Sequence, residues 1–294
     1  MTDVRNYTAR GYASTRHGQI HYRTAGEGPP LLLLHATPHS SRVYKKLVPF
    51  LSPHHRVIAV DTLGFGYSDP LPPDVSMEKL AESCADLMAD LALPPAAVFG
   101  LHTGNKVGAA LAAGWPDRVS YFICCGMTHS IVVEREKRDS AIKAIVNKAL
   151  SKEQPAADGS HLLRNWARTF DGVSHLWWGP GLVDAFPLSD QDLQDTQGEV
   201  IDRILSRPSY DAIYRANFAF DLSAALARLA MPSLIVELAV REEAHLGRQA
   251  EACVRLNRKS QAVTLEYSDR DVLERVPQIL AQAILHFLSG KPAR

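Results

Sequence analysis

Short, mostly apolar runs alternate with amphipathic stretches along the first 126 residues of the chain. Runs of this kind are typical of strands that are buried on both faces, as in a parallel sheet. The stretches between them have the spacing of helices, and Ser76 stands where a helix cap is expected. Strand, helix, strand in this order predicts parallel pairing. The predicted strands are 31–34, 56–60, 96–99 and 120–125, and the predicted helices are 42–51, 76–93 and 105–114.

Residues 12–24 have a different pattern, in which polar and apolar positions alternate around the pair His17-Gly18. Alternation indicates a strand with one buried face, and glycine in the turn is typical of a hairpin. We therefore expect an antiparallel hairpin at one edge of the sheet.

Residues 127–220 lack the short apolar runs typical of strands, and they contain helical patterns and several tryptophans instead. We interpret this stretch as a helical cap inserted into one α/β core. The predicted core is 1–126 together with 221–294, and the predicted cap is 127–220. Beyond the cap the pattern predicts helices at 222–229, 246–256 and 277–288, and strands at 232–237 and 262–267.

Net charge, cysteine spacing and the length of apolar runs limit which binding partners and which cellular compartment are expected. The 294 residues include 32 basic and 32 acidic side chains, so no net field favours nucleic acid or an anionic membrane. The four cysteines have no metal-binding or disulfide-framework spacing, which predicts buried, reduced thiols. No apolar run is long enough to span a bilayer, and residues 1–6 lead into no apolar segment. We expect a soluble, cytoplasmic protein with a small neutral or weakly charged ligand.

Residues Phe99 to Gly104 have the layout of a nucleophile elbow, a sharp turn from a strand into a helix. Gly100 and Gly104 fit this turn, because a side chain two positions from its centre would collide with the backbone. The usual central residue is serine, and this chain has His102 instead.

Several further motifs stand in a characteristic order around the elbow, namely His35-Ala36-Thr37-Pro38, Asp61-x-x-Gly64-x-Gly66-x-Ser68, Pro116-x-Arg118-Val119 and Glu274-x-x-Pro277. Together they make the sequence resemble the α/β-hydrolase superfamily, in the capped branch that includes haloalkane dehalogenases, epoxide hydrolases and ring-cleavage-product hydrolases. The resemblance implies an α/β fold, with a mostly parallel central sheet flanked by helices and a pocket between sheet and cap. It implies no cofactor.

The same resemblance implies three catalytic positions, and none of them holds its usual residue. His102 replaces the nucleophile, which is Ser, Asp or Cys in the family. Arg241 stands about where the family has an acid, with Glu242 next to it, and Arg270 stands where the family has histidine. The side-chain part of the catalytic machinery is therefore atypical.

The oxyanion hole of the family consists of backbone N–H groups, which here belong to Thr37 and Thr103. Ala36 replaces the usual glycine in the loop that carries Thr37. Because backbone donors do not depend on side-chain identity, this feature can persist without the usual triad.

His102 has two interpretations, which both stay open at this point. The macrodipole at a helix N-terminus disfavours imidazolium, so a neutral ring could act as a base or a nucleophile. A carboxylate would normally orient such a ring, and the candidates are Asp61, Glu242, Asp269 and Asp271. Alternatively, His102 only lines a ligand pocket on a scaffold that has lost hydrolysis.

Four more residues are candidates for the substrate pocket, namely His39, Trp166, Trp177 and Arg270. An arginine there could bind a carboxylate or a polarised oxygen, whereas the simpler alternative is an ion pair with a neighbouring acid. Cap aromatics could wall an apolar cavity or only pack the cap against itself. We expect no metal site, because no histidine pair has the close spacing typical of one.

The sequence thus favours a hydrolase that acts on a small, largely apolar carbonyl compound: an ester, a lactone or a diketone. The alternatives are a non-catalytic, ligand-binding pseudo-hydrolase and a cofactor-free lyase or oxygenase in which His102 abstracts a proton. Neither nucleic acid nor a membrane is an expected partner, and the oligomeric state stays open.

Overall fold

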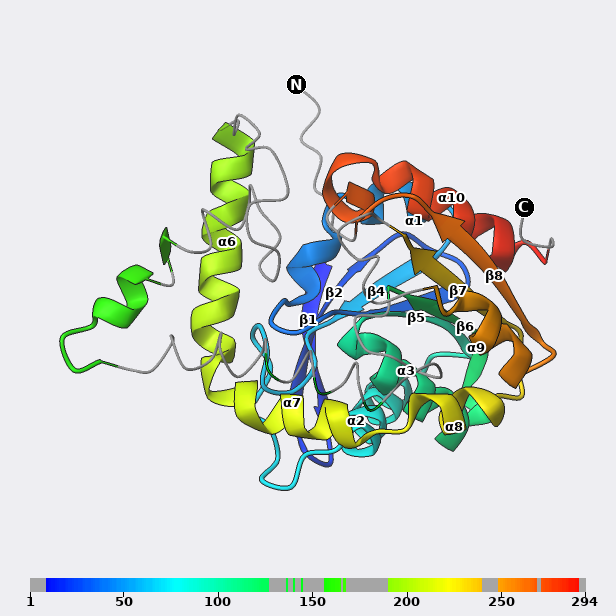
Figure 1. Ribbon diagram of the computed structural model, residues 1–294, viewed down its shortest axis with the longest axis horizontal. Helices are drawn as coiled ribbons and strands as arrows, with labels where there is room; N and C mark the ends of the chain where they lie inside the picture. Colours follow the sequence, from blue (N-terminus) through cyan, green and yellow to red (C-terminus); the bar gives the residue numbers. More distant parts are fainter. Residues whose placement is uncertain are drawn as a thin grey trace.

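An eight-stranded, mostly parallel sheet forms the centre of the protein (Figure 1). The computed structural model describes residues 9–126, 136, 140, 144, 156–164, 166–167, 190–239, 248–268 and 271–290. The strand order is β1-β2-β4-β3-β5-β6-β7-β8. The strands are β1 (Ala9–Thr15), β2 (Gly18–Ala25), β3 (Pro30–Leu34), β4 (Arg56–Val60), β5 (Ala96–Leu101), β6 (Val119–Cys125), β7 (Ser233–Leu238) and β8 (Ser260–Leu265).

The strand pairing confirms the pattern expected from the sequence. β1 and β2 form the antiparallel hairpin at one edge, and β2 also pairs antiparallel with β4. All pairs from β4 to β8 are parallel. The carboxyl ends of β3, β5, β6, β7 and β8 therefore lie along one edge of the sheet, where ligands of open α/β folds bind.

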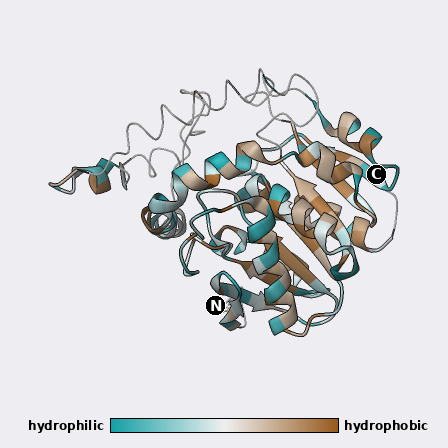
Figure 2. Cartoon of the chain, turned by 90° about the horizontal axis from the view of Figure 1, so that it is seen from below, coloured by the Kyte–Doolittle hydropathy of each residue, from teal (hydrophilic) through white to brown (hydrophobic). Residues whose placement is uncertain are grey.

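Helices cover both faces of the sheet (Figures 1 and 2). One face packs against α2, α3, α7, α8 and α9, and the other packs against α1 and α10. The α-helices are α1 (Val48–Leu51), α2 (Met77–Asp90), α3 (Thr103–Gly114), α6 (Asp190–Ser206), α7 (Tyr210–Ala219), α8 (Leu222–Ala227), α9 (Ala250–Leu256) and α10 (Pro277–Leu288). Shorter turns are η1 (Ser41–Tyr44), η2 (Pro116–Arg118), η3 (Arg207–Ser209) and η5 (Asp271–Arg275).

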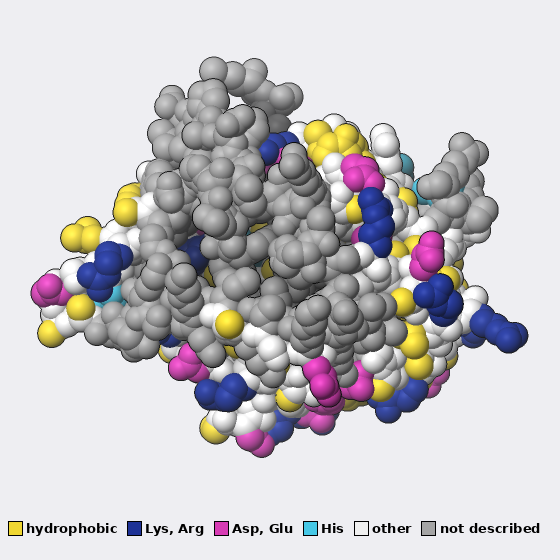
Figure 3. Space-filling view, in the orientation of Figure 1, with side chains coloured by type: hydrophobic (Ala, Val, Ile, Leu, Met, Phe, Trp, Pro, Cys, Tyr) yellow, Lys and Arg dark blue, Asp and Glu magenta, His cyan; other side chains and the backbone are white. Residues whose placement is uncertain are grey.

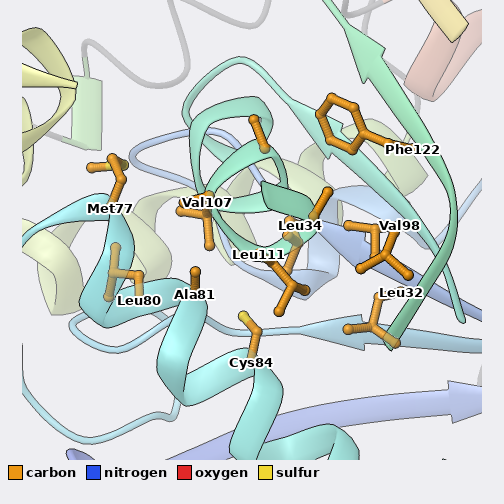
Figure 4. Close-up of a cluster of buried hydrophobic side chains, with 14 of the residues drawn as sticks. Leu32, Leu34, Met77, Leu80, Ala81, Cys84, Val98, Val107, Leu111 and Phe122 are labelled. Carbon is orange, nitrogen blue, oxygen red and sulfur yellow. The ribbon is translucent and has the colours of Figure 1, made fainter. Parts of the chain in front are cut away.

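Strand β3 shows why the apolar runs are continuous. Leu32 and Leu34 belong to the core on the α2 and α3 side, where Figure 4 shows them, and Leu31 and Leu33 belong to the core on the α10 side. Successive side chains of a strand point to opposite faces, so a strand covered on both faces needs apolar residues at every position. Each buried leucine contributes about 1.5–3 kcal/mol by leaving water.

The predicted helix 42–51 is wrong as a single element. The structure has the 3-10 turn η1, a linking turn and the short helix α1 instead. Pro49 explains the break, because its ring would clash with the carbonyl of Lys45 in a continuous helix and it has no N–H to donate. The predicted helix 76–93 is correct at its start, where Ser76 Oγ accepts a hydrogen bond from the Lys79 N–H at 3.2 Å.

The described part of the region between β6 and β7 contains helical segments joined by turns. Helices α6 and α7 lie there, and α6 flanks the end of the sheet near β1 and β2 in Figure 1. The limits of the cap, 127–220, stay a prediction. Trp177, Arg241 and Arg270 lie outside the described residues.

The four cysteines are buried and free, as predicted. Burial raises the pKa of Cys84 to about 12, so this thiol stays protonated. No helix within the described ranges has the length and apolar character to cross a bilayer. Basic and acidic side chains are interspersed around the face shown in Figure 3, in keeping with the zero net charge.

Asp61 ties the hairpin and the loop after β3 to the end of β4. Its carboxylate accepts hydrogen bonds from His21 Nδ1 at 2.8 Å, the Ser41 N–H at 2.6 Å and the Tyr67 N–H at 3.0 Å. Burial alone would raise the pKa of Asp61, but the bonds from His21 and Ser41 outweigh it and lower the pKa to about 2. Gly66 makes room for this carboxylate, because a Cβ there would lie 2.1 Å from Oδ2.

We predict that Asp61→Asn destabilises the protein by about 2–3 kcal/mol at pH 7, because a carboxamide turns a donor toward backbone N–H groups. The folded pKa lies below the ordinary 3.8, so the stabilisation is present above that pH and is lost as pH falls through about 2. Urea unfolding between pH 3 and pH 7 measures the difference. Asp90→Asn, at an exposed position, is the control, and equal stability of the two variants would contradict the prediction.

Candidate active site

The turn at His102 has the strained geometry of a nucleophile elbow. β5 ends at Leu101 and α3 begins at Thr103, with His102 between them at φ 48° and ψ −105°. A non-glycine residue in this region costs of order 1–3 kcal/mol and persists only where its surroundings hold it. A Cβ at Gly100 would lie 2.5 Å from the Gly104 carbonyl, and one at Gly104 would lie 2.1 Å from the Leu34 carbonyl. Glycine is therefore required at both positions, as predicted.

The imidazole of His102 lies directly over Gly126, the residue that follows β6. A Cβ at Gly126 would lie 2.8 Å from Cε1 of the ring and 3.1 Å from Nε2. Gly126 also has φ 62°, where glycine is favoured. The ring is half-buried, so one side rests on backbone while part of it stays accessible to a ligand.

The side chain of Asn105 joins the first turn of α3 to the end of β6. Its Nδ2 donates to the carbonyls of Cys125 at 2.9 Å and Gly126 at 2.6 Å, and its Oδ1 accepts from the Cys125 N–H at 3.0 Å. The His102 N–H donates to the same Cys125 carbonyl at 3.1 Å. These bonds fix the elbow and the glycine beneath the imidazole as one unit.

Thr37 and Thr103 carry the two backbone N–H groups that the sequence assigns to an oxyanion hole, and this role stays a prediction. Thr103 is the first residue of α3, so its N–H has no partner within the helix and carries the positive end of the macrodipole. Thr37 lies in the loop after β3, and the close contact of Gly104 with Leu34 and His35 brings that loop to the elbow. The structure records no hydrogen bond from either N–H to another described residue.

His35 fixes the start of this loop through hydrogen bonds to Ala36 and Thr62. Its Nδ1 donates to the Ala36 carbonyl at 2.9 Å, and its Nε2 accepts from the Thr62 N–H at 3.1 Å. Burial lowers the pKa of His35 against the raising effect of the Ala36 bond, so the ring is neutral. His39 is half-buried in the same loop, and its N–H donates to the Ala36 carbonyl at 2.8 Å.

The carboxylates considered as partners of His102 have contacts elsewhere where the structure describes them. Asp61 is bound as described above. Asp271 accepts from Ser268 Oγ at 2.7 Å and pairs with Arg275 at 2.9 Å. The other candidates, Glu242 and Asp269, lie outside the described residues.

Glu237 is a further buried carboxylate, at the end of β7. It accepts from the N–H groups of Gln249 and Ala250 at 2.6 Å and 3.0 Å, where α9 begins. Its role in the described contacts is to cap that helix.

Trp166 is the one predicted cap residue of the pocket that the structure describes. It lies in a short helical segment, green in Figure 1, that projects beyond α6 and away from the sheet in Figures 1 and 2. The residue is 44% exposed. The described structure thus brings His102, Thr103 and the Thr37 loop together without Trp166, and its role in the pocket stays a prediction. Within the described ranges no three His, Cys, Asp or Glu side chains gather as possible metal ligands.

Two buried polar residues of α3 escaped the sequence analysis. Asn105 and Lys106 directly follow the elbow, in a helix whose other residues are mostly small or apolar. The ammonium of Lys106 donates to the Asn217 carbonyl in α7. Buried polar residues need hydrogen-bond partners, so two polar residues in a helix that lies close to a sheet indicate specific contacts. This was the signal in the sequence that could have identified Asn105 and Lys106.

Comparisons with known proteins agree with this geometry. The family model for the alpha/beta hydrolase fold matches residues 29–238. Haloalkane dehalogenase 2 of Mycobacterium tuberculosis is 32% identical over 114 residues, which are 38% of this chain and 40% of that protein. Pimeloyl-acyl-carrier-protein methyl ester esterase of Vibrio campbellii is 33% identical over 119 residues, 40% of this chain and 45% of that protein. The match spans less than half of either relative.

A solved structure extends the similarity to nearly the whole chain. The enol-lactonase from Burkholderia xenovorans LB400 superposes with a TM-score of 0.67 at 21% identity, covering 95% of this chain and 100% of its own. Identity at this level shows a shared fold. With the family match over more than half of its length, and with the elbow and the mostly parallel sheet described above, the chain belongs to the alpha/beta hydrolase fold family.

Proposed function

We propose that the protein is a hydrolase of small, largely apolar carbonyl compounds, with esters and lactones as the first candidates and diketones next. An esterase among its sequence relatives and an enol-lactonase among its structural neighbours support this substrate class. The zero net charge of the chain favours a neutral substrate over a polyanion. His102 acts as the base or the nucleophile.

The observation that carries the proposal is the arrangement at the elbow. The backbone of His102 has a strained φ, and its imidazole lies over Gly126. The start of α3 and the loop that carries Thr37 lie beside it. A carbonyl oxygen that receives the N–H groups of Thr37 and Thr103 would gain stabilisation as it becomes negative. One such donor is worth about 2.7–4 kcal/mol in the transition state.

The two roles of His102 lead to different reaction steps. As a nucleophile, a ring nitrogen bonds to the carbonyl carbon, the alkoxide leaves as the alcohol after taking up a proton, and water then releases the acid and the free ring. As a base, the ring takes a proton from water while that water adds to the carbonyl, and it returns the proton to the leaving alkoxide. Only the route in which His102 is the nucleophile places a transient acyl group on the His102 ring.

A non-catalytic, ligand-binding protein is the second candidate. The arginines at positions 241 and 270, where the family has its acid and its histidine, favour it. Such a protein would bind a small carbonyl ligand saturably at the elbow without turning it over. A cofactor-free lyase or oxygenase would also differ, because its product would not contain the elements of water.

We predict that His102→Ala lowers kcat for the best substrate in a panel of activated esters, lactones and ring-cleavage diketones by about 100-fold or more. Mass spectrometry of the products shows whether water has been added. His54→Ala, which removes an exposed histidine before β4, is the control and keeps its activity. Activity that survives His102→Ala would contradict the proposal, and saturable binding without turnover would support the second candidate.

We predict that Gly126→Ala lowers kcat/KM by about 10- to 100-fold, because the added methyl group displaces the His102 imidazole from its position. Gly290→Ala is the matched control, since Gly290 has a similar φ of 75° and open space around it. Comparing the two variants by steady-state kinetics and thermal unfolding separates displacement of the ring from backbone strain. Equal kinetics in both variants would show that Gly126 does not position His102.

A further inference from the structure

The loop that follows Thr37 is held by one face of α6, although the two segments are far apart in the sequence. Gly198, Asp202 and Ser206 lie four residues apart on that helix and therefore share a face. We call these three residues the α6 face. Each of them contacts residues between Pro38 and Arg42.

Asp202 makes the central contact of the α6 face. Its Oδ2 accepts a hydrogen bond from Ser40 Oγ at 2.7 Å, and its Oδ1 lies 3.5 Å from Arg42 Nε. Its side chain is 4% exposed, whereas that of Arg42 is 29% exposed, so the Asp202 carboxylate is shielded from water and its arginine partner only in part. In a low-dielectric interior a hydrogen bond to a carboxylate is electrostatically stronger than the same bond in water, although burying the charge has its own cost.

The other two residues extend the contact along the loop. Ser206 Oγ donates to the carbonyl of Asp202 at 2.7 Å and, more weakly, to that of Pro38 at 3.4 Å. A Cβ at Gly198 would lie 2.7 Å from Cδ of Arg42, so glycine at this point lets the arginine lie along the helix. The α6 face thus holds the loop from the residue after Thr37 to the first turn of η1.

Ser40 connects Asp202 to the backbone of the loop. Its Oγ also accepts from the Arg42 N–H at 3.2 Å and caps η1, while the neighbouring Ser41 N–H is held by Asp61. The loop is fixed by a carboxylate of the sheet on one side and a carboxylate of α6 on the other. Loss of the α6 contact would leave one of these two restraints.

We propose that Asp202 is a positioning residue, which holds the loop so that the Thr37 N–H points at the substrate carbonyl. The proposal rests on the function given above, since it takes Thr37 as a donor to the developing oxyanion. Asp202 touches no reacting atom and acts through Ser40, Arg42 and the loop backbone.

Burial raises the pKa of Asp202 to about 6, against the lowering effects of Arg42 and Ser40, and the charge of Asp61 adds to the rise. A folded pKa above the ordinary 3.8 means that the contribution to stability is full below that pH and is lost as pH rises through about 6. Ionised Asp202 at pH 8 therefore stabilises the fold less than protonated Asp202 does. Variants that remove its charge are expected to fold at that pH.

The test compares Asp202→Ala, Asp202→Asn and the control Asp211→Ala, which changes an exposed aspartate of α7. Hydrogen exchange of the His39 and Val43 amides reports the loop directly, because these amides bond to the Ala36 and Ser40 carbonyls. We expect Asp202→Ala to speed their exchange by about 10-fold or more and Asp211→Ala to leave it unchanged. Asp202→Asn keeps an acceptor for Ser40 and is expected to restore most of the protection.

Kinetics at pH 8 on the best substrate of the panel form the second arm. Asp202→Ala is expected to lower kcat by about 10- to 100-fold with KM little changed, because the oxyanion develops only in the transition state. Unchanged exchange in Asp202→Ala overturns the proposal whatever the activity, and so does faster exchange with wild-type kcat. If Asp202→Ala speeds exchange but the wild-type protein turns over no substrate of the panel, the loop contact is supported. The oxyanion role and the proposed function are then both overturned.

Discussion

The first turn of α3 lies so close to the carboxyl ends of β3 and β5 that no side chain fits at Gly100 or Gly104. This approach determines the rest of the site. It forces His102 into a strained conformation, exposes the Thr103 N–H at the helix start and brings the loop after β3 beside it. The strain at His102 is tolerated because the surrounding core and the Asn105 bonds to β6 offset its cost.

Two buried carboxylates hold the loop at this site, and their environments differ in a way that matters for stability. Asp61 has three donors, including His21, and its pKa falls to about 2. Asp202 has fewer and weaker partners for a similar burial, and its pKa rises to about 6. For Asp61 the ionised form therefore favours folding more than the protonated form does, and for Asp202 the reverse holds. Burial alone does not determine either pKa, because the number and geometry of the hydrogen-bond donors determine whether the ionised or the protonated carboxyl group is favoured.

Much of the fold could be predicted from the sequence, because local pattern and tertiary environment agree. A strand such as Leu31 to Leu34 is apolar throughout since it is covered on both faces, and glycine at positions 100 and 104 is demanded by the turn itself. The predicted helix 42–51 failed where Pro49 interrupts a pattern that otherwise fits a helix.

The partners of polar residues were less accessible from the sequence. Ser40 and Asp202 are 162 positions apart, and no periodicity within either segment indicates that they meet. Asn105 gave a weak signal as a polar residue on a helix close to the sheet, but the identity of its acceptors depends on how β6 ends. Candidate catalytic positions follow from the order of motifs in the chain, whereas the chemistry of an imidazole at the elbow depends on contacts between distant segments.

The central claim is that the elbow with His102 adds water to a carbonyl compound. Turnover of a small lactone in water enriched in oxygen-18, followed by mass spectrometry of the product, tests it most directly. The account predicts one labelled oxygen in the hydroxy acid, formed by the wild-type protein and not by His102→Ala. A product without the label, or equal labelling by both proteins, would contradict it.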